Sequence, residues 1–533
     1  MRRDFAQLAD GPHDLLVIGG GIYGAWVAHD AALRGLRVVL VDRLDWGSGT
    51  SQSSSKLIHG GLRYLQYGRL GLVRKSLLER RLLLRLAPHR VRPLRFVLPV
   101  YRGSRTGRFK LGIGLRIYDA LANARNVGRH HRLSSDDIEA DYPFLNNADL
   151  VGGFTYGDAQ TDDARLTLEI VEGAAEAGAK VVNYAEATGF ILDGKRVVGA
   201  YVTDRETTRK IEVRADVTVH CGGPWVPELL GDARRPMKAP VQLAKGVHLV
   251  MPGLPTDRGI LVQGSQRGRV TFLLPWYGRT LLGTTDTEYT GDPGTARIAA
   301  EEIDELLEKA NGVLMGTNWK RADIISGFVG VRTLPASRPG RKTSSISRGF
   351  SLRSPADGLL VPIGGKLTSA RSDAVDVVNR VESLRGHSPR KSRTAERPFP
   401  WRPDRYRRWR VESISDAMDA GLDEEVARVA GQRYGNRLGR LLDTVRETPE
   451  LAARIVPDLP FVWGEVPLAV THEMAISLED VVRRRIPVGL LVKDPDQTLR
   501  AVGQMMQQLL GWSNQRMAEE LNHTRRKLAV LEV

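Results

Sequence analysis

The sequence is almost free of cysteine and has no long apolar run. Cys221 is the only cysteine among 533 residues, so one copy can form neither a disulfide nor a cysteine-based metal cluster. No stretch approaches the ~18 uninterrupted apolar residues of a membrane span, and residues 1–10 lack the apolar core of a signal peptide. We therefore expect a cytoplasmic protein without a metal site, neither secreted nor membrane-spanning.

Acidic residues are too few to balance the basic ones. Lys and Arg number 78 against 62 Asp and Glu, which gives a formal net charge of +16. Such an excess fits nucleic acid, an anionic membrane face or an anionic substrate, and composition does not choose among them. Residues 77–86 predict an amphipathic helix whose arginine face contacts either solvent or lipid. No nucleic-acid-binding motif accompanies the charge, so we expect no nucleic-acid partner.

The length requires more than one domain. A chain of 533 residues exceeds the roughly 250–300 residues at which a single hydrophobic core stops growing. Residues 386–405 are dense in Arg, Lys, Ser and Pro, which is typical of an exposed linker. Beyond them the apolar periodicity is mostly helical, so we expect an α-helical C-terminal domain.

A dinucleotide-binding unit begins near the start of the chain. Residues 14–19 predict a buried strand, residues 25–34 a helix and residues 36–41 a second strand. Gly19-x-Gly21-x-x-Gly24 lies between the first strand and the helix, where backbone amides and the helix N-terminus can face a pyrophosphate. Asp42 ends the second strand, where its carboxylate can accept hydrogen bonds from ribose hydroxyls. An ordinary glycine turn is the alternative.

The stretch that follows Asp42 favours FAD over NAD. Residues 46–65 are small and rich in hydroxyl groups, which suits a segment running along an extended cofactor. They include Lys56-Leu-Ile-His-Gly-Gly-Leu-Arg-Tyr64, which places cationic, imidazole and phenol groups on a double-glycine turn. The alternative is a flexible serine-rich linker.

The middle of the chain alternates between irregular and strand-rich segments. Between about residues 93 and 163 the periodicity weakens, as in an inserted segment. Residues 166–178 predict a helix, and residues 197–203 with 210–214 predict a hairpin. Strands with few long helices continue to about residue 286. We expect an antiparallel sheet packed beside the nucleotide domain.

Several long motifs, in one order along nearly the whole chain, resemble those of the FAD-dependent glycerol-3-phosphate dehydrogenases and oxidases. They are the glycine fingerprint and residues 54–65, 162–165, 223–225, 245–248, 283–293, 330–332 and 364–368. Residues 471–485 also resemble the helical domain of that family.

The resemblance implies an α/β fold with a Rossmann-like FAD-binding domain of the glutathione-reductase or D-amino-acid-oxidase type. An antiparallel-sheet substrate cap and the α-helical C-terminal domain complete it. We expect the FAD-binding domain in residues 1–92, 150–240 and 325–385, and the cap in residues 93–149 and 241–324. The linker and the helical domain follow as residues 386–405 and 406–533.

The resemblance also implies the reaction. Family members oxidise the C2 alcohol of glycerol 3-phosphate to dihydroxyacetone phosphate, with hydride transfer to flavin N5. Electrons then pass to a membrane quinone in the dehydrogenases, or to oxygen in the oxidases. The partners we expect are a small phosphorylated polyol, a quinone, an anionic membrane surface on the inner face, and a second copy in a homodimer.

The residues expected to contact FAD come from five separated segments. They are Gly19, Gly21, Gly24, Asp42, Thr50, Ser51, Ser54, Lys56, Leu57, His59, Ala187, Gly223, Lys366, Leu367 and Thr368.

The expected substrate site combines cations with a base. A phosphate held away from water favours guanidinium groups, and Arg63, Arg332 and Arg348 are the candidates, with Tyr64 beside them by resemblance. Removing the hydroxyl proton requires a group such as a neutral imidazole, for which His59 and His248 are the candidates. Lys366 could bind substrate and stabilise anionic reduced flavin. Surface ion pairs, a core histidine and a solvated lysine are the alternatives.

Two departures from the family pattern concern the substrate. The double-glycine turn continues as Thr368-Ser-Ala-Arg371, without the aromatic residue that family members often have there. Residues 334–343 are more basic than the usual version. An oxidase, or a dehydrogenase of another phosphorylated hydroxy compound, therefore stays open as an alternative.

Overall fold

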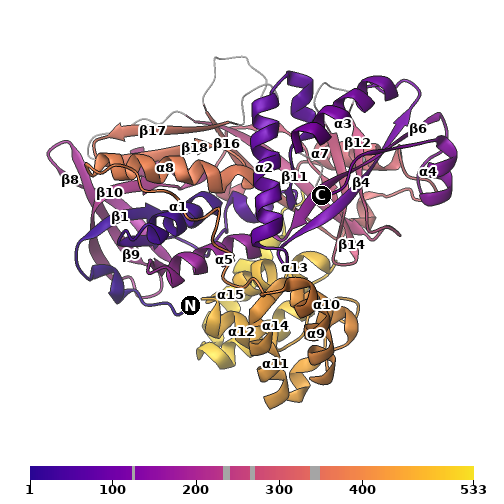
Figure 1. Ribbon diagram of the computed structural model, residues 1–533. Coiled ribbons are helices and arrows are strands. Elements are labelled where there is room, and N and C mark those ends of the chain that lie inside the picture. The colour runs from indigo at the N-terminus through magenta and orange to yellow at the C-terminus, as the bar shows by residue number, and fades with distance from the viewer. Residues whose placement is uncertain (123–126, 232–240, 265–269, 336–348, 533) are drawn as a thin grey trace.

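The computed structural model describes residues 1–122, 127–231, 241–264, 270–335 and 349–532. Figure 1 shows two sheet-containing lobes side by side and a helical lobe below them, with helix α2 (Leu70–Leu86) between the two sheets. Over the described ranges, no helix is both long and apolar enough to cross a membrane.

The first sheet has eight strands and a parallel centre. Its order is β17-β18-β10-β1-β2-β7, and β9 and β8 continue from β10 as an antiparallel hairpin. The strands are β1 (His13–Ile18), β2 (Val38–Val41), β7 (Lys180–Val182), β8 (Ala185–Asp193), β9 (Arg196–Asp204), β10 (Lys210–His220), β17 (Phe350–Ala356) and β18 (Leu359–Gly364). Every residue of β1 is buried, as expected for a parallel strand covered on both faces.

Three helices pack together on this sheet. Helix α1 (Ile22–Leu33) follows β1 through the glycine turn and packs against α5 (Asp163–Glu176) and α8 (Ala370–Leu384). Small residues such as Ala25, Ala28 and Ala31 are fully buried in that interface. The predicted Rossmann-like arrangement is confirmed by these elements.

The second sheet has ten strands and is mostly antiparallel. Its order is β15-β11-β14-β13-β12-β4-β6-β3, with β16 on β11 and β5 on β6. The strands are β3 (Leu57–Ile58), β4 (Val91–Tyr101), β5 (His131–Leu133), β6 (Leu150–Thr161), β11 (Val241–Pro252), β12 (Gly259–Gln263), β13 (Val270–Trp276), β14 (Arg279–Gly283), β15 (Thr287–Tyr289) and β16 (Ser326–Pro335). Helices α3 (Arg108–Ala122), α4 (Ser135–Asp141) and α7 (Ala300–Asn311) accompany it.

Three strands pair differently from the predicted division of the chain. We placed residues 1–92, 150–240 and 325–385 in the FAD-binding part, but β3, β6 and β16 belong to the second sheet. There β3 pairs with β6, β6 with β4, and β16 with β11. Within residues 93–163, β6 has a physical reason for its weak alternation, because most of this strand is buried on both faces. The domain boundaries themselves stay a prediction.

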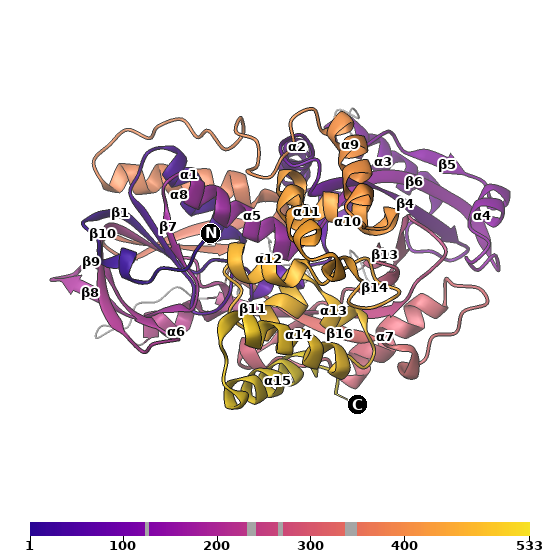
Figure 2. The same ribbon diagram turned by 90° about the horizontal axis from the view of Figure 1, so that it is seen from below.

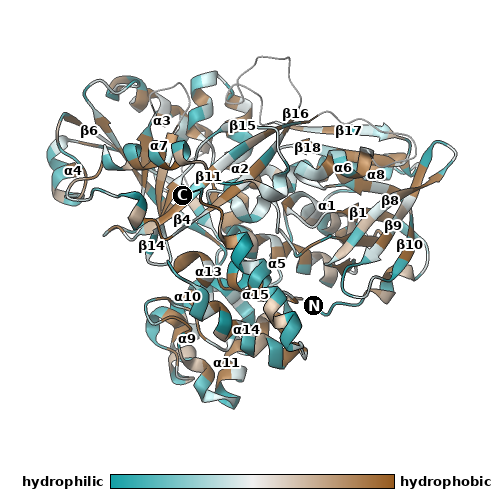
Figure 3. Cartoon of the chain, turned by 180° about the vertical axis from the view of Figure 1, so that it is seen from behind, coloured by the Kyte–Doolittle hydropathy of each residue, from teal (hydrophilic) through white to brown (hydrophobic). Residues whose placement is uncertain are grey.

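The C-terminal part is helical, as predicted. Its elements are α9 (Tyr406–Asp419), α10 (Glu424–Tyr434), α11 (Leu438–Glu447), α12 (Glu465–His472), a π-helical turn (Asp480–Arg485), α13 (Val488–Leu491), α14 (Asp496–Leu510) and α15 (Asn514–Leu528). They form one lobe when the molecule is seen from below (Figure 2). Helix α15 is largely hydrophilic (Figure 3), whereas Leu478 and Val481 join a core that also contains Phe272 and Phe328 of the second sheet.

Residues 386–405 are only partly an exposed linker. They contain no helix or strand, and residues 386–391 are exposed. Phe399 and Trp401 are buried, however, and the backbone and indole N–H groups of Trp401 donate to Glu169 and Glu172 of α5. The second half of the segment is therefore anchored, because its aromatic side chains fill the core beneath α1 and α5.

Candidate active site

A cavity of about 550 Å³ is lined by residues of both sheets. The ends of β1, β2, β10 and β18 contribute Ile18, Asp42, His220 and Gly364, so the cavity lies at the carboxyl edge of the parallel strands. Open α/β sheets bind their ligands at this edge.

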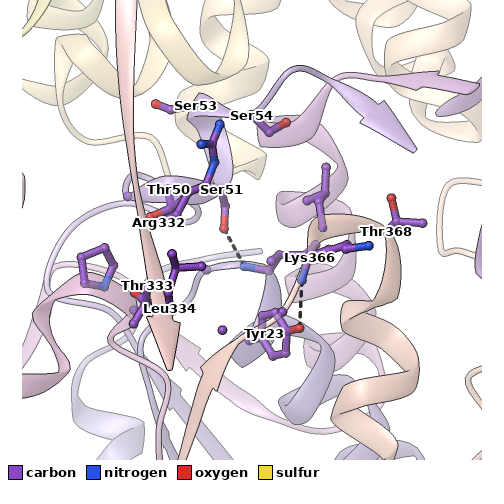
Figure 4. Close-up of a pocket in the computed structure, with 18 of the residues that line it drawn as sticks. Tyr23, Thr50, Ser51, Ser53, Ser54, Arg332, Thr333, Leu334, Lys366 and Thr368 are labelled. Carbon is purple, nitrogen blue, oxygen red and sulfur yellow. Dashed lines mark hydrogen bonds between the residues drawn. The ribbon is translucent and has the colours of Figure 1, made fainter. Parts of the chain in front are cut away.

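The glycine turn forms one end of the cavity. Gly19 has φ +103°, and a Cβ at Gly24 would lie 1.8 Å from the carbonyl oxygen of Gly19, so the turn and the close strand-to-helix packing both require glycine. Helix α1 begins beside the cavity, and the Ile22 N–H donates to Ser51 Oγ at 2.9 Å (Figure 4). A helix N-terminus opened by such a turn fits the pyrophosphate of a dinucleotide.

Asp42 lies where a ribose is expected. Its carboxylate accepts hydrogen bonds from the N–H groups of Gly20 and Leu44, at 2.6 and 2.8 Å. Burial raises the pKa of Asp42 to about 6. Ala187 and Gly223 line the same cavity, so the predicted contacts for the nucleotide half of FAD come together.

The serine-rich loop runs along the cavity. Thr50, Ser51 and Ser54 line it, and the Thr50 hydroxyl donates to the Val331 carbonyl at 2.5 Å. Ser54 donates through its backbone N–H and its hydroxyl to Asp163 Oδ2. The loop is therefore fixed at several points, unlike a flexible linker.

Lys56 lies behind this lining. It has φ +55°, and its Nζ lies 2.6 Å from Asp163 Oδ1, with both side chains buried. The ion pair neutralises the charge of the ammonium group, and Lys56 does not line the cavity. Lys56 therefore holds the loop through Asp163, and its contact with FAD stays a prediction.

Three cations, Lys366, Arg63 and Arg332, surround Tyr64 in the same cavity. Lys366 Nζ lies 3.8 Å from the centroid of the Tyr64 ring, and Arg63 Nη2 donates to the Tyr64 hydroxyl at 3.3 Å. Arg332 Nη2 donates to Thr284 Oγ1 at 3.2 Å, and its Nη1 lies 3.6 Å from Asp286. Lys366 Nζ and Arg332 Nη1 are buried without a hydrogen bond among the described residues. Buried cationic groups that lack hydrogen-bond partners are suited to bind an anionic ligand.

Burial and neighbouring charged groups both shift the pKa values in this cluster. Burial lowers the pKa values of Lys366 and Arg332. Burial alone would raise the pKa of Tyr64, but Arg63, Lys366 and Arg332 outweigh it, so the phenol pKa is lowered. A phosphate would relieve the repulsion among the cations.

The two candidate histidines occupy different layers. His59 lines the cavity, and burial together with Lys366 and Arg63 lowers its pKa to about 3. His248 is buried, stacks on Phe328 and lies behind Ser55, with its Nε2 2.9 Å from Ser55 Oγ. Burial lowers the pKa of His248 well below its usual value. Both imidazoles are neutral near pH 7. His59 and Ser55 belong to the cavity lining, whereas His248 lies behind Ser55.

Most of the predicted site residues line this one cavity. They are Gly19, Gly21, Asp42, Thr50, Ser51, Ser54, Leu57, His59, Arg63, Tyr64, Ala187, Gly223, Arg332, Lys366, Leu367 and Thr368. Gly24 shapes the turn, while Lys56 and His248 lie behind the lining. Arg348 lies outside the described residues. The roles of all these residues stay predictions.

Tyr23 is a cavity residue that the sequence analysis missed. Its hydroxyl accepts the Lys366 N–H at 3.2 Å (Figure 4) and donates to Asp373 at 2.5 Å. A Cβ at Gly365 would lie 1.5 Å from this hydroxyl. Tyr23 therefore sets the double-glycine turn before Lys366, and its place inside the glycine fingerprint was the available signal.

The sequence matches two family models. Residues 14–362 match the model described as FAD dependent oxidoreductase. Residues 401–517 match the C-terminal domain of alpha-glycerophosphate oxidase. Together the two matches extend over both sheets and most of the helical lobe.

Named relatives extend over nearly the whole chain. It is 33% identical to a glycerol-3-phosphate dehydrogenase of Synechocystis, over 97% of each chain. It is 31% identical to an aerobic glycerol-3-phosphate dehydrogenase of Staphylococcus epidermidis, over 96% of this chain and 94% of the relative. Among solved structures, the glycerol-3-phosphate dehydrogenase of Bacillus halodurans complexed with FAD superposes with a TM-score of 0.80 and 28% identity, over 99% of this chain and 96% of the other.

Proposed function

Because this chain belongs to the FAD-dependent oxidoreductases of the glycerol-3-phosphate dehydrogenase family, we propose that it oxidises sn-glycerol 3-phosphate to dihydroxyacetone phosphate. FAD is its cofactor. The observation that carries the choice of substrate is the cluster of Arg63, Arg332 and Lys366, which shares one cavity with the glycine turn.

The cation cluster binds the phosphate of the substrate in this proposal. Arg63 and Arg332 offer guanidinium groups that can donate to two phosphate oxygens at once and remain charged when water is excluded. Tyr64 and Thr284 orient these guanidinium groups by hydrogen bonds. A substrate without a phosphate leaves the cations uncompensated, so specificity for a phosphorylated alcohol follows.

The cavity lining from Gly19 to Ser54, with Ala187, Gly223 and Thr368, would hold FAD. When bound, FAD supplies the hydride acceptor, its N5, for the hydrogen on substrate C2. Lys366 is placed to offset negative charge at that end of the cavity, since its Nζ is buried without a hydrogen-bonded partner among the described residues.

The proton of the C2 hydroxyl needs a neutral base. His59 lines the cavity beside the cations, and His248 can act through the Ser55 hydroxyl, which lines the cavity and lies 2.9 Å from His248 Nε2. Along that second route, Ser55 accepts the substrate proton as it passes its own proton to His248. A phosphate bound to Arg63, Arg332 and Lys366 would offset the positive charge that lowers the pKa values of both histidines.

We further propose a membrane quinone as the electron acceptor and a peripheral position on an anionic membrane. Supporting this, α3 exposes Phe109, Ile113 and Ile117 beside the exposed cations Lys110 and Arg116. Leu111 of the same helix lines the cavity, so an apolar acceptor at this surface would lie near it. A homodimer stays a prediction.

The two remaining alternatives are an oxidase and a dehydrogenase of another phosphorylated hydroxy compound. Steady turnover with oxygen alone, without a quinone analogue, would favour the oxidase. Reduction by a larger phosphorylated polyol in preference to glycerol 3-phosphate would favour the other dehydrogenase.

Anaerobic reduction tests the proposal directly. The purified yellow holoprotein should lose its flavin absorbance when glycerol 3-phosphate is added, but not when glycerol is added. Arg332→Ala should keep the oxidised spectrum and raise the half-reducing substrate concentration about 10- to 100-fold, because hydrogen bonds to charged groups contribute about 1.5–3 kcal/mol.

Arg321→Ala is the matched control, since Arg321 pairs with Asp304 on the surface. It should behave as the parent protein does. A holoprotein that stays yellow with glycerol 3-phosphate would remove this substrate, and an unchanged Arg332→Ala titration would remove Arg332 from the phosphate site.

A further inference from the structure

A cluster of buried charges joins the helical C-terminal lobe to the loop that follows β2. Arg484 and Arg485 end the π-helical turn, and their side chains are 2% and 1% exposed. They meet the fully buried carboxylate of Asp45, which lies three positions after Asp42. Arg485 and Asp45 are 440 positions apart in the sequence.

The two arginines bind the loop at Asp45 and at Gln52. Arg485 donates from Nη1 and Nη2 to the two oxygens of Asp45, at 2.8 and 2.9 Å. Arg484 donates from Nε to Asp45 at 2.6 Å and from Nη1 to Gln52 Oε1 at 3.2 Å. The residues between these two points include Ser48, Gly49, Thr50 and Ser51, which line the cavity.

The arginines are themselves held in place from the helical side. Arg484 also pairs with Glu479 at 2.8 Å and Asp480 at 2.6 Å. Arg485 donates to the Glu473 backbone carbonyl at 2.8 Å. Because each guanidinium is a planar fork fixed on several sides, its position dictates where Asp45 lies.

Net stability alone gives little reason for this arrangement. Burying ion pairs costs desolvation, and apolar replacements of similar volume are often equally stable. The ion pairs of Arg484 and Arg485 with Asp45 instead fix the orientation of the Asp45 carboxylate and the position of its loop. The π-helical turn is consistent with this, since such turns occur frequently at functional sites.

We propose that Arg484 and Arg485 are positioning residues for FAD, and that the affinity for FAD depends on the helical C-terminal lobe through Asp45 and Gln52. The 45–52 loop keeps its shape because the two guanidinium groups fix both of its ends. This inference rests on the cofactor alone, so the identity of the substrate does not affect it.

Titration of FAD-free, full-length protein with FAD tests the proposal, followed by quenching of flavin fluorescence. Asp45→Asn and Arg485→Lys should raise the FAD dissociation constant at least 10-fold. Activity at saturating FAD should stay within about a factor of two, because none of these side chains lines the cavity. The proposal is overturned if folded Asp45→Asn binds FAD with the same dissociation constant as the parent protein.

Two further variants separate positioning from general destabilisation. Glu382→Gln disrupts the fully buried Arg34–Glu382 pair, 2.8 Å long, which lies outside the cavity lining; it should lower the melting temperature yet leave the dissociation constant unchanged. Gln52→Ala removes the hydrogen bond between Arg484 and the loop without leaving a buried charge, and it should raise the FAD dissociation constant about 3- to 10-fold. This variant carries the test if Asp45→Asn does not fold. Equal weakening of FAD binding in Glu382→Gln would assign the effect to loss of stability, against the proposal.

Discussion

Buried His29 makes the stability of this fold depend on pH. It stacks on Trp26 inside the first lobe, and burial lowers its pKa from 6.5 to about 4. In the unfolded chain His29 takes up a proton near pH 6.5, whereas in the folded chain it stays neutral until about pH 4. Its contribution to stability is therefore complete above pH 6.5 and falls as the pH drops from 6.5 to about 4.

Replacing His29 should flatten the acid side of the stability profile. A group with this shift contributes a slope of about 1.4 kcal/mol per pH unit. His29→Gln should have a lower melting temperature at pH 7 but lose less on going from pH 6.5 to 4.5 than the parent does, as measured by thermal melting of the holoprotein. His387→Gln, at an exposed position, should keep the parental slope. The same slope in both variants would contradict the assignment.

At the residue scale, a sequence pattern places residues along the chain but does not show which of them face a cavity. Gly19, Gly21 and Asp42 could be predicted as FAD contacts because a strand, a glycine turn and a second strand dictate their places within about thirty residues. His248 lies behind Ser55, not on the cavity, since a motif does not show which face of a strand meets a ligand. Tyr23 was missed because its partner, the Lys366 amide, lies 343 positions away.

Helix α2 illustrates the same limit at the scale of elements. Residues 77–86 predicted an amphipathic helix with either solvent or lipid on its arginine face. In the structure Leu77, Leu83 and Leu86 are buried, but Leu78 is 48% exposed. Arg80 is buried as well and pairs with Asp158 at 2.5 Å, so the leucines and arginines do not divide into an inward and an outward face. The larger exposed apolar surface lies on the neighbouring α3, where Phe109 is 82% exposed. Periodicity marks an apolar face, but it does not say what covers that face.

The proposed membrane contact through α3 predicts that removing Phe109 weakens binding to anionic vesicles. Full burial of such a side chain contributes about 1.5–3 kcal/mol, so Phe109→Ser should lower partitioning into anionic vesicles roughly 10- to 100-fold. Co-sedimentation with vesicles of phosphatidylglycerol and phosphatidylcholine measures this. Tyr201→Ser, at an exposed position on β9, is the control and should bind as the parent does. Equal binding of both variants would place the membrane surface elsewhere.

At the scale of the whole molecule, length predicted more than one domain, and periodicity predicted a nucleotide-binding unit, an antiparallel sheet and a helical C-terminal part. The contacts that join these parts could not be predicted. Arg165 of α5 pairs with Glu473 at 2.6 Å, and Leu478 shares a core with Phe272. Such contacts join segments far apart in the sequence, and each partner alone looks like an ordinary charged or apolar residue.

These shared contacts predict that the helical lobe does not fold alone. A fragment of residues 404–533 would keep the Glu473–Arg485 pair but lose Arg165 and Asp45. It would also expose Leu478 and Val481, whose core includes Phe272 and Phe328. Each such side chain contributes about 1.5–3 kcal/mol when fully buried, which is a large part of the stability of a small domain, about 5–15 kcal/mol. The fragment should lack a cooperative thermal transition in circular dichroism. If it melted cooperatively near the temperature of the intact chain, the lobe would be an independent domain, and its hold on the FAD loop would be a docking contact between two folded units.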